Sequence, residues 1–528
     1  MRASSVALIA LAAIAPTLHA QSPERAVFVV RQGAETLAVE TASRNGARLE
    51  GRLILRSPLL RVGQEVTLTD SSTVERVVTL VSPGASGAAV QQRAELTFRG
   101  DSAVSHVEDV RAPAPIPDRR LKVTPGAIPF VNLSGLSLEL ILRRARALGG
   151  DTARVPVILL GGQTVTATVT RVGTDSLLLA LGGVTLRARS DGEGRLLGAA
   201  VPAQNVVFER LAGDAAAGRW VPVMESYAAP VGAPYTAEAV TVRTPVGLSL
   251  AGTLTLPTRR PAAGVPAVVL ITGSGPQDRD ESSSFLPKAY RPFREIADTL
   301  SRRGIAVLRL DDRGVGSSDV GPLTATSADF ADDVRAALVW LRTRPEIDAT
   351  RLGLVGHSEG GIIAPMVATT DRRVRAIALI AGTASTGRTI SEYQIRYLFS
   401  RDTTLARARR DSLLALALRQ ADSAFATPGW VRWFGDYDPL PTARRVRVPA
   451  LILQGETDRQ VPLAEAARLA AGMRAAGNRR VIVRTFPRMN HLMLDDPSGD
   501  VRGYGSLPSY HVRKDLLGAL ADWLARSL

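Results

Sequence analysis

The 528-residue chain contains no cysteine, only five histidines and only three lysines. Without cysteine it can form no disulfide, no thiolate zinc site and no thiol nucleophile. Five histidines leave little material for a histidine-rich metal site, and we expect neither a bound metal nor a cofactor. Catalysis by an imidazole must use one of a small set of side chains, namely His19, His106, His357, His491 and His511.

The basic charge of the chain is high but dispersed. The sequence has 65 basic and 50 acidic residues, a formal net charge of +15, and all but three of the basic residues are arginine. The longest basic runs are pairs such as Arg302-Arg303 and Arg479-Arg480. A nucleic-acid-binding surface concentrates its positive charge on one face or stripe. The dispersed charge therefore indicates a solvated surface and no nucleic-acid partner.

The first twenty residues have the pattern of an export signal. Arg2 gives a positive start, residues 6–15 form an apolar run, and the small residue Ala20 precedes a polar stretch. The run is shorter than the roughly 20 residues that a membrane-spanning helix needs. We expect a signal peptide at 1–20 and an exported protein, periplasmic or secreted, with no stable transmembrane segment after cleavage. The alternatives are a disordered N-terminus and a retained anchor.

The N-terminal half has mostly the two-residue apolar period of half-buried strands. Residues 164–170 alternate cleanly, and the pattern predicts a β-rich accessory region over 21–227. A helical period interrupts it over 136–148. The proline-rich stretch at 112–117 marks a possible subdivision, and 228–235 has the composition of a linker.

The C-terminal half, residues 236–528, has a different pattern. Short continuous apolar runs alternate with segments of helical period, and the runs lie at 267–271, 305–310, 352–355, 376–380, 450–454 and 481–486. This alternation predicts an α/β fold class, with a mostly parallel sheet covered by helices on both faces. The reactive groups of such sheets gather outside the carboxyl ends of the strands.

An insertion at 382–438 has helical spacing and predicts a small helical lid. Its two tryptophans, Trp430 and Trp433, are candidate substrate-binding residues that roof an acyl pocket. They are equally suited to form the core of the lid itself, and the sequence leaves both interpretations open.

The candidate nucleophile is Ser358, at the centre of the Gly-His-Ser-Glu-Gly segment 356–360. The segment follows the apolar run 352–355 and opens a helical segment. A serine on so sharp a strand-to-helix turn needs small neighbours two positions away on each side, and Gly356 and Gly360 supply them. The alternative is a glycine-rich helix start that a serine merely caps.

The candidate general base is His491, a few residues after the apolar run 481–486 and hence at the sheet edge expected for Ser358. His511 is the rival, further along the chain. His357 adjoins the nucleophile, but its side chain leaves the turn on a different side, and we expect a packing role.

The candidate orienting acid is Asp458, in the loop after the apolar run 450–454, with Glu456 as the second choice. A plain loop carboxylate is the alternative. The order Ser358, Asp458, His491 along the chain is the order expected on this architecture.

Residues 236–528 resemble the α/β-hydrolase superfamily, specifically its exported bacterial serine esterases. The resemblance lies in five segments, namely 273–280 (GSGPQDRD), 312–318 (DRGVGSS), 356–361 (GHSEGG), 455–458 (GETD) and 490–492 (NHL). It implies Ser358 as nucleophile, Asp458 as orienting acid and His491 as general base. Relatives usually carry histidine where this chain has Thr272, and the resemblance does not extend to the β-rich half.

An oxyanion hole on this architecture uses backbone amides. The first donor is expected to be the N–H of Glu359, the residue after the nucleophile, and the second that of Ser274 or a glycine beside it. The leading expectation is hydrolysis of a small-molecule acyl ester through an acyl-enzyme. Peptide or amide cleavage by the same triad is the close alternative, and a non-catalytic envelope binding protein on a hydrolase scaffold is the second alternative.

Overall fold

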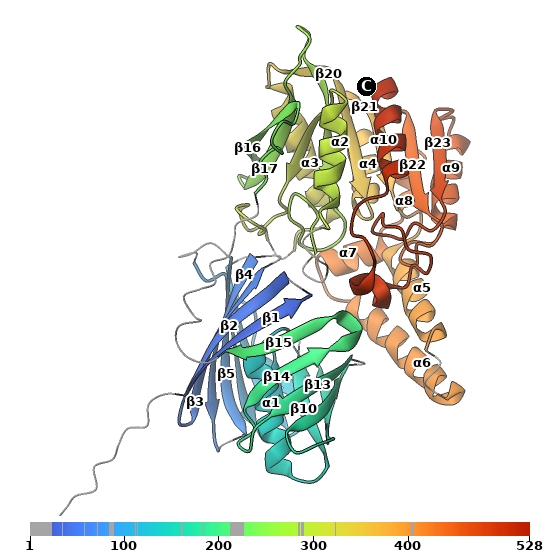
Figure 1. The fold of residues 1–528 in the computed structure, drawn as a ribbon. Coiled ribbons are helices and arrows are strands. Elements are labelled where there is room, and N and C mark those ends of the chain that lie inside the picture. Colours follow the sequence, from blue (N-terminus) through green and yellow to red (C-terminus); the bar gives the residue numbers. More distant parts are fainter. Residues whose placement is uncertain are drawn as a thin grey trace, which may run out of the picture.

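The computed structural model describes residues 24–528 except 34, 57–58, 71, 84–88, 111, 113, 160–161, 183, 212–225, 284–285, 287–289, 323 and 403–405. The expected signal peptide therefore lies outside the described residues. The described chain forms two domains, one above the other in Figure 1, each built on its own sheet. No helix among the described residues is long and apolar enough to cross a membrane.

The N-terminal domain is built on a 15-stranded sheet whose neighbouring strands are antiparallel, except for β9 and β10. The strands are β1 (Glu24–Gln32), β2 (Glu35–Asn45), β3 (Arg48–Arg56), β4 (Leu59–Leu68), β5 (Val74–Pro83), β6 (Gln92–Arg99), β7 (Ser102–Asp109), β8 (Arg119–Lys122), β9 (Ile128–Phe130), β10 (Thr152–Leu159), β11 (Thr164–Arg171), β12 (Ser176–Leu181), β13 (Val184–Ser190), β14 (Leu196–Val201) and β15 (Val206–Leu211). The possible subdivision at 112–117 does not separate two sheets, because β7 and β8 on either side of it pair with each other.

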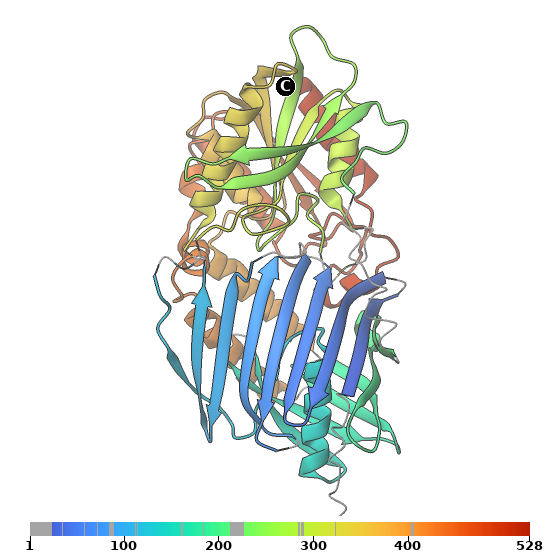
Figure 2. The ribbon, with the colours of Figure 1, turned by 90° about the vertical axis from the view of Figure 1, so that its left-hand side faces the viewer.

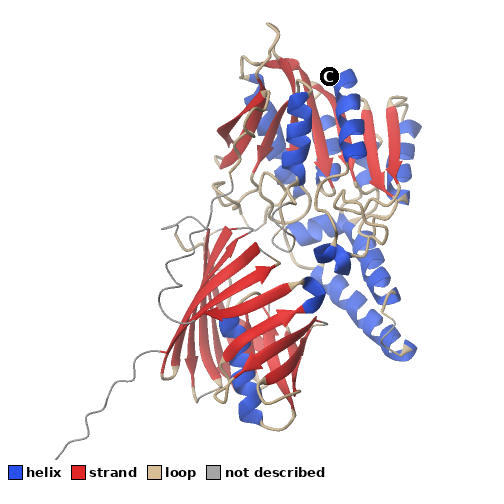
Figure 3. Cartoon of the chain, in the orientation of Figure 1, coloured by secondary structure: helices blue, strands red, loops and turns tan. Residues whose placement is uncertain are grey.

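The sheet is rolled so far that its two edges approach one another (Figures 1 and 3). Its edge strands, β8 and β9, are joined by only the five residues 123–127, which reach about 20 Å at most. The edges meet through side chains: a Cβ placed on Gly162, after β10, would lie 2.9 Å from Leu121 of β8. The domain is therefore close to a barrel, and it encloses an interior.

Helix α1 (Gly135–Leu148) lies on the concave side of the rolled sheet. Most of its residues are buried, and its buried leucines, Ile141 and Ala145 belong to one apolar cluster with the strands. Glu40 of β2 holds its N-terminus, accepting the Ser134 hydroxyl at 2.7 Å and the Leu136 amide at 2.9 Å. A Cβ on Gly135 would lie 2.3 Å from the ring of Phe28, so only glycine permits this approach.

The C-terminal domain has the predicted α/β architecture. Its eight-stranded sheet has the order β16-β17-β19-β18-β20-β21-β22-β23 and is parallel from β19 to β23. The strands are β16 (Tyr235–Arg243), β17 (Ser249–Pro257), β18 (Val265–Ile271), β19 (Ala306–Leu310), β20 (Ile347–His357), β21 (Val374–Ile380), β22 (Ala450–Gly455) and β23 (Val481–Phe486). Five of the six apolar runs of the sequence overlap the strands β18 to β22 and are almost fully buried, as expected for a sheet covered on both faces. The sixth run, 481–486, is the edge strand β23, in which Ile482 is exposed.

Helices cover both faces of this sheet (Figure 1). One face carries α3 (Ser327–Arg342), α4 (Gly360–Ala368), α8 (Pro439–Ala443) and α9 (Ala464–Ala475), and the other carries α2 (Pro292–Arg302) and α10 (Lys514–Ser527). The insertion between β21 and β22 holds α5 (Gly387–Ser400), α6 (Arg407–Ala424) and α7 (Trp430–Asp436) before α8. Helices α5 and α6 project beside the N-terminal domain in Figure 1.

The two domains meet at the carboxyl ends of the parallel strands (Figure 2). The 3-10 helix η3 (Val501–Ser506) of the C-terminal domain contacts the 3-10 helix η1 (Pro202–Gln204) of the rolled sheet. The edge of the α/β sheet at which reactive groups gather therefore faces one end of the rolled sheet.

Candidate active site

Ser358 lies on a strained turn between β20 and α4. Its φ is +52°, a left-handed value that an L-residue adopts at a cost, and strain of this kind clusters at functional sites. A Cβ on Gly356 would lie 2.0 Å from the carbonyl oxygen of Gly360, and one on Gly360 would lie 2.2 Å from that of Ile271. The turn is therefore possible only with glycine at both positions. This steric requirement explains the two glycines of the segment 356–360.

His491 and Asp458 form a buried hydrogen-bonded pair. The Nδ1 of His491 lies 2.9 Å from Oδ2 of Asp458, and both side chains are almost fully buried. The other oxygen of Asp458 accepts the amides of Gln460 and Val461, each at 2.8 Å. These bonds fix the carboxylate, which in turn favours the imidazole tautomer with its proton on Nδ1 and a free Nε2.

Glu281 and His357 form a second buried pair beside Ser358. Nδ1 of His357 lies 2.9 Å from Oε1 of Glu281, and Nε2 lies 2.9 Å from the backbone oxygen of His491. Burial lowers the pKa of His357, but the charge and hydrogen bond of Glu281 outweigh it, and the net pKa is raised. Both ring nitrogens face oxygen acceptors, an arrangement that favours the protonated imidazole, which can donate from both.

Glu281 is the site residue that the sequence analysis missed. Its φ is +55°, and the same oxygen that meets His357 also accepts the amide of Gly273 at 2.6 Å. Its other oxygen is buried without a hydrogen-bond partner among the described residues. The only signal was its place directly after the segment 273–280, which is tied down by the buried Arg279–Asp311 pair.

The two backbone amides expected to form an oxyanion hole belong to different loops, since Glu359 follows Ser358 at this turn and Ser274 lies in the loop after β18. The N–H of Glu359, the residue before α4, belongs to the amides of a helix start that have no intrahelical partner. Ser274 lines the same cavity as Ser358. The amide of Gly273 is already donated to Glu281, which removes that glycine as the second donor and favours Ser274.

The carboxylate of Glu359 points away from this chemistry. It accepts hydrogen bonds from the Ser327 hydroxyl at 2.5 Å and the Trp430 indole at 2.8 Å. Burial raises its pKa, although both hydrogen bonds act in the opposite direction. Glu359 thus ties helix α7 of the insertion to α3, while its backbone remains at the turn.

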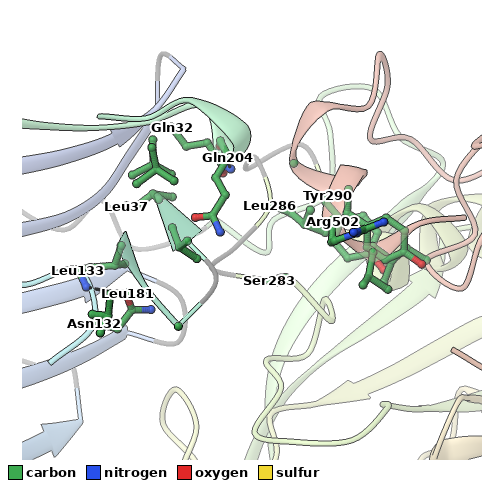
Figure 4. Close-up of a pocket in the computed structure, with 18 of the residues that line it drawn as sticks. Gln32, Leu37, Asn132, Leu133, Leu181, Gln204, Ser283, Leu286, Tyr290 and Arg502 are labelled. Carbon is green, nitrogen blue, oxygen red and sulfur yellow. Dashed lines mark hydrogen bonds between the residues drawn. The ribbon is translucent and has the colours of Figure 1, made fainter. Parts of the chain in front are cut away.

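One cavity of about 750 Å³ joins the catalytic candidates to the rolled sheet. Ser274, Ser358 and His491 line it from the C-terminal domain. Leu37, Leu133 and Leu181 lie across from Leu286, Tyr290 and Arg502 in Figure 4, so the two domains supply opposite walls. A volume of this size lies in the upper part of the range of about 300–1,000 Å³ typical of ligand pockets.

The remaining predicted residues lie elsewhere. Neither tryptophan lines this cavity: Trp430 donates to Glu359, and Trp433 stacks on Tyr437 with ring centroids 4.4 Å apart. The N-terminal domain, not these tryptophans, forms the facing wall, which corrects the expectation of a tryptophan roof. The exposed ring of His511 pairs with Glu295 at 3.2 Å, away from the cavity lining.

Comparison with known proteins agrees with this fold. The model of the alpha/beta hydrolase family matches residues 268–503. The C-terminal half belongs to the α/β-hydrolase superfamily. Within that superfamily, the esterase EstD of Thermotoga maritima is 29% identical over 285 residues, which are 52% of this chain and 66% of EstD.

Two further proteins that are similar to the C-terminal half are named for different activities. The uncharacterized peptidase YuxL of Bacillus subtilis is 25% identical over 213 residues, 38% of this chain and 28% of YuxL. The chain therefore spans less than two thirds of EstD and of YuxL. The solved Pyrococcus furiosus esterase Pf2001 is 16% identical with a TM-score of 0.38, covering 58% of this chain and 98% of that one.

Proposed function

We propose that this α/β hydrolase is a serine esterase that cleaves small-molecule acyl esters through an acyl-enzyme. The observation that carries the proposal is that Ser358, on its strained turn, shares one cavity with His491, whose Nδ1 is held by Asp458. The relative EstD, an esterase by name, supports an ester as the substrate.

The proposed mechanism uses the shared cavity of Ser358 and His491 and the hydrogen bond of His491 to Asp458. Nε2 of His491 takes the proton of the Ser358 hydroxyl as its oxygen attacks the ester carbonyl carbon, and Asp458 stabilises the imidazolium that results. The amides of Glu359 and Ser274 bind the oxyanion. His491 then gives its proton to the leaving alcohol, and water, deprotonated by His491, releases the acid from Ser358.

The test combines covalent labelling with turnover. A serine-reactive fluorophosphonate is expected to label the wild-type protein at Ser358, and Ser358→Ala is expected to lose the label and about 10⁶ in kcat for p-nitrophenyl acetate. Ser400→Ala, an exposed serine on α5, is the matched control and should retain both. Retained turnover in Ser358→Ala would contradict the assignment.

Peptide amides are assayed beside the esters because the relative YuxL is named a peptidase. Cleavage of amides with no cleavage of esters would replace the esterase by a peptidase on the same triad. Absence of labelling by the wild-type protein would favour the binding protein on a hydrolase scaffold.

We further propose that residues 1–20 direct export and are cleaved after Ala20, as their charge and apolar run suggest. The N-terminal sequence of the protein recovered from the periplasm or the medium tests this. A start at Gln21 is expected, and recovery of the uncleaved chain only from the cytoplasm would contradict it.

A further inference from the structure

The cavity at Ser358 continues into the interior of the rolled sheet. Its wall in the N-terminal domain comes from several elements of that sheet and from the start of α1, and it includes the apolar side chains Phe130, Leu138, Val165, Leu181 and Phe208. These side chains belong to the apolar cluster around α1 or pack against it. The interior that encloses α1 is therefore not filled at the end that faces Ser358.

The apolar surface at this end is incompletely covered by protein. Phe130, Leu133, Leu159, Val165, Leu181 and Val184 all line the cavity and are only partly buried. Leu133 also holds a left-handed backbone, with φ at +62°, an unfavourable conformation for leucine. Apolar surface left open inside a domain is costly in water and becomes favourable when an apolar group covers it.

The two parts of the cavity differ in the charge of the side chains that line them. In the part contributed by the N-terminal domain, the described lining residues include no charged side chain, and their polar members are uncharged, such as Gln32, Asn132 and Gln204. The charged lining residues, Glu281 and Arg502, are on the side of Ser358. The far part therefore suits an uncharged apolar chain and not a sugar, a nucleotide or a charged peptide.

We infer that the substrate is an ester with a long apolar chain, and that this chain lies inside the N-terminal domain while the ester carbonyl lies at Ser358. The inference rests on the proposed esterase function and gives that function its substrate class. A chain of this chemistry belongs either to the acyl group or to the alcohol. The rolled sheet then acts as the binding site that selects for chain length.

Two substrate series distinguish the two sources of the chain. In the first, p-nitrophenyl esters carry acyl chains from acetyl to dodecanoyl, and in the second, acetate esters carry n-alkyl alcohols of the same lengths, all below their micellar concentrations. We expect kcat/KM to rise in one series by up to about fourfold per methylene and to level off once the cavity is full. A rise in the first series assigns the cavity to the acyl chain, and a rise in the second assigns it to the alcohol.

A pair of variants on one strand tests whether the chain lies in the rolled sheet. Leu181 and Leu177 are both half-buried on β12 and point to the same face of the sheet, but only Leu181 lines the cavity. Leu181→Gln is expected to lower kcat/KM for the longest good substrate about tenfold more than it lowers kcat/KM for p-nitrophenyl acetate, which has no long chain. Leu177→Gln should leave both substrates within twofold.

A second variant tests the same location of the chain by filling the cavity instead of changing its polarity. Val165→Trp places a large ring in the same end of the cavity, so the chain length of highest kcat/KM should become shorter while acetate turnover persists. Circular dichroism spectra of the variants establish that they fold.

The outcomes separate this inference from the proposed function. Acetate turnover with no dependence on chain length in either series would overturn the inference and leave the esterase standing. Binding is measured separately by calorimetry with Ser358→Ala, which should bind dodecanoate at least tenfold more tightly than butyrate, a preference that Leu181→Gln reduces. Equal binding of the two acids, together with equal binding of dodecanol and butanol to the same variant, would overturn the inference whether or not the protein is an esterase.

Discussion

The carboxylate of Glu281 lies 2.9 Å from Nδ1 of His357, and the pair is buried beside Ser358 and His491. Glu281 also holds the amide of Gly273, while His357 donates to the backbone oxygen of His491. The pair thus ties the loop that contains Ser274 to the loop that contains the candidate base. Its role is to position these two loops around the nucleophile.

Glu281→Gln is expected to lower kcat for p-nitrophenyl acetate about tenfold and to decrease the free energy of unfolding by about 3 kcal/mol. The neutral amide no longer raises the pKa of His357, so the buried imidazole becomes neutral and can donate only one of its two hydrogen bonds. Steady-state kinetics and urea unfolding measure the two effects.

Glu295→Gln is the matched control for this substitution. Glu295 pairs with His511 at 3.2 Å in the same type of contact, but the pair lies near the surface and outside the cavity lining. The control should change kcat by less than twofold. An unchanged kcat in Glu281→Gln would show that the pair does not position the site.

Asp458→Asn is expected to reduce kcat about 10⁴-fold, because an amide nitrogen facing Nδ1 of His491 favours the tautomer with its proton on Nε2. Glu456→Gln changes the second candidate acid, an exposed side chain that accepts from Thr485, and is expected to retain full activity. A larger loss in Glu456→Gln than in Asp458→Asn would exchange the two assignments.

The two histidine candidates are separated by alanine substitution. His491→Ala should lose about 10⁶ in kcat, since the proposed general base is removed, whereas His511→Ala should keep nearly all activity because its side chain is 72% exposed. The measurement is turnover of p-nitrophenyl acetate with labelling by the fluorophosphonate. Turnover that survives in His491→Ala and fails in His511→Ala would reverse the choice.

Glu40 gives the N-terminal domain a pH-dependent stability. Burial raises its pKa from 4.5 to about 7, although hydrogen bonds from Leu136 and Ser134 act in the opposite direction. Between these two values the unfolded chain has lost the proton and the folded chain retains it. The contribution of Glu40 to stability is therefore largest below pH 4.5 and falls, by about 3 kcal/mol, as the pH rises to about 7.

Glu40→Gln should remove this contribution to the pH dependence of stability. The melting temperature of the variant should therefore change less than that of the wild type between pH 4.5 and pH 7. Glu50→Gln, at an exposed position on the neighbouring strand β3, should keep the wild-type slope. A wild-type slope in Glu40→Gln would mean that Glu40 ionises in the folded protein at its ordinary pKa.

Elements with a strong local pattern were predictable from the sequence. The helical period over 136–148 is helix α1, and the apolar runs of the C-terminal half coincide with parts of strands β18 to β23. The glycines around Ser358 were informative because the local turn excludes any larger side chain. In each case the local backbone or the local burial restricts which residue types can occur, so the pattern is visible in a short stretch of sequence.

The roles of Glu281 and Trp430 could not be predicted in this way. Glu281 meets His357 across 76 positions of sequence, and Trp430 meets Glu359 across 71. No local sequence pattern predicts a partner so far away for a single glutamate or tryptophan. An indole is also equally suited to a pocket or a lid core.

By itself, the sequence determined that the C-terminal half is an alternating α/β domain, and it left serine, without any cysteine, as the candidate nucleophile. Only the tertiary structure decided that the β-rich half faces Ser358 and shares its cavity. The physical reason is that a two-residue apolar period records which face of a strand is buried, but not what covers it. The sequence does not distinguish Leu181 from the other interior leucines of the β-rich half. In the structure, Leu181 lines the same cavity as Ser358.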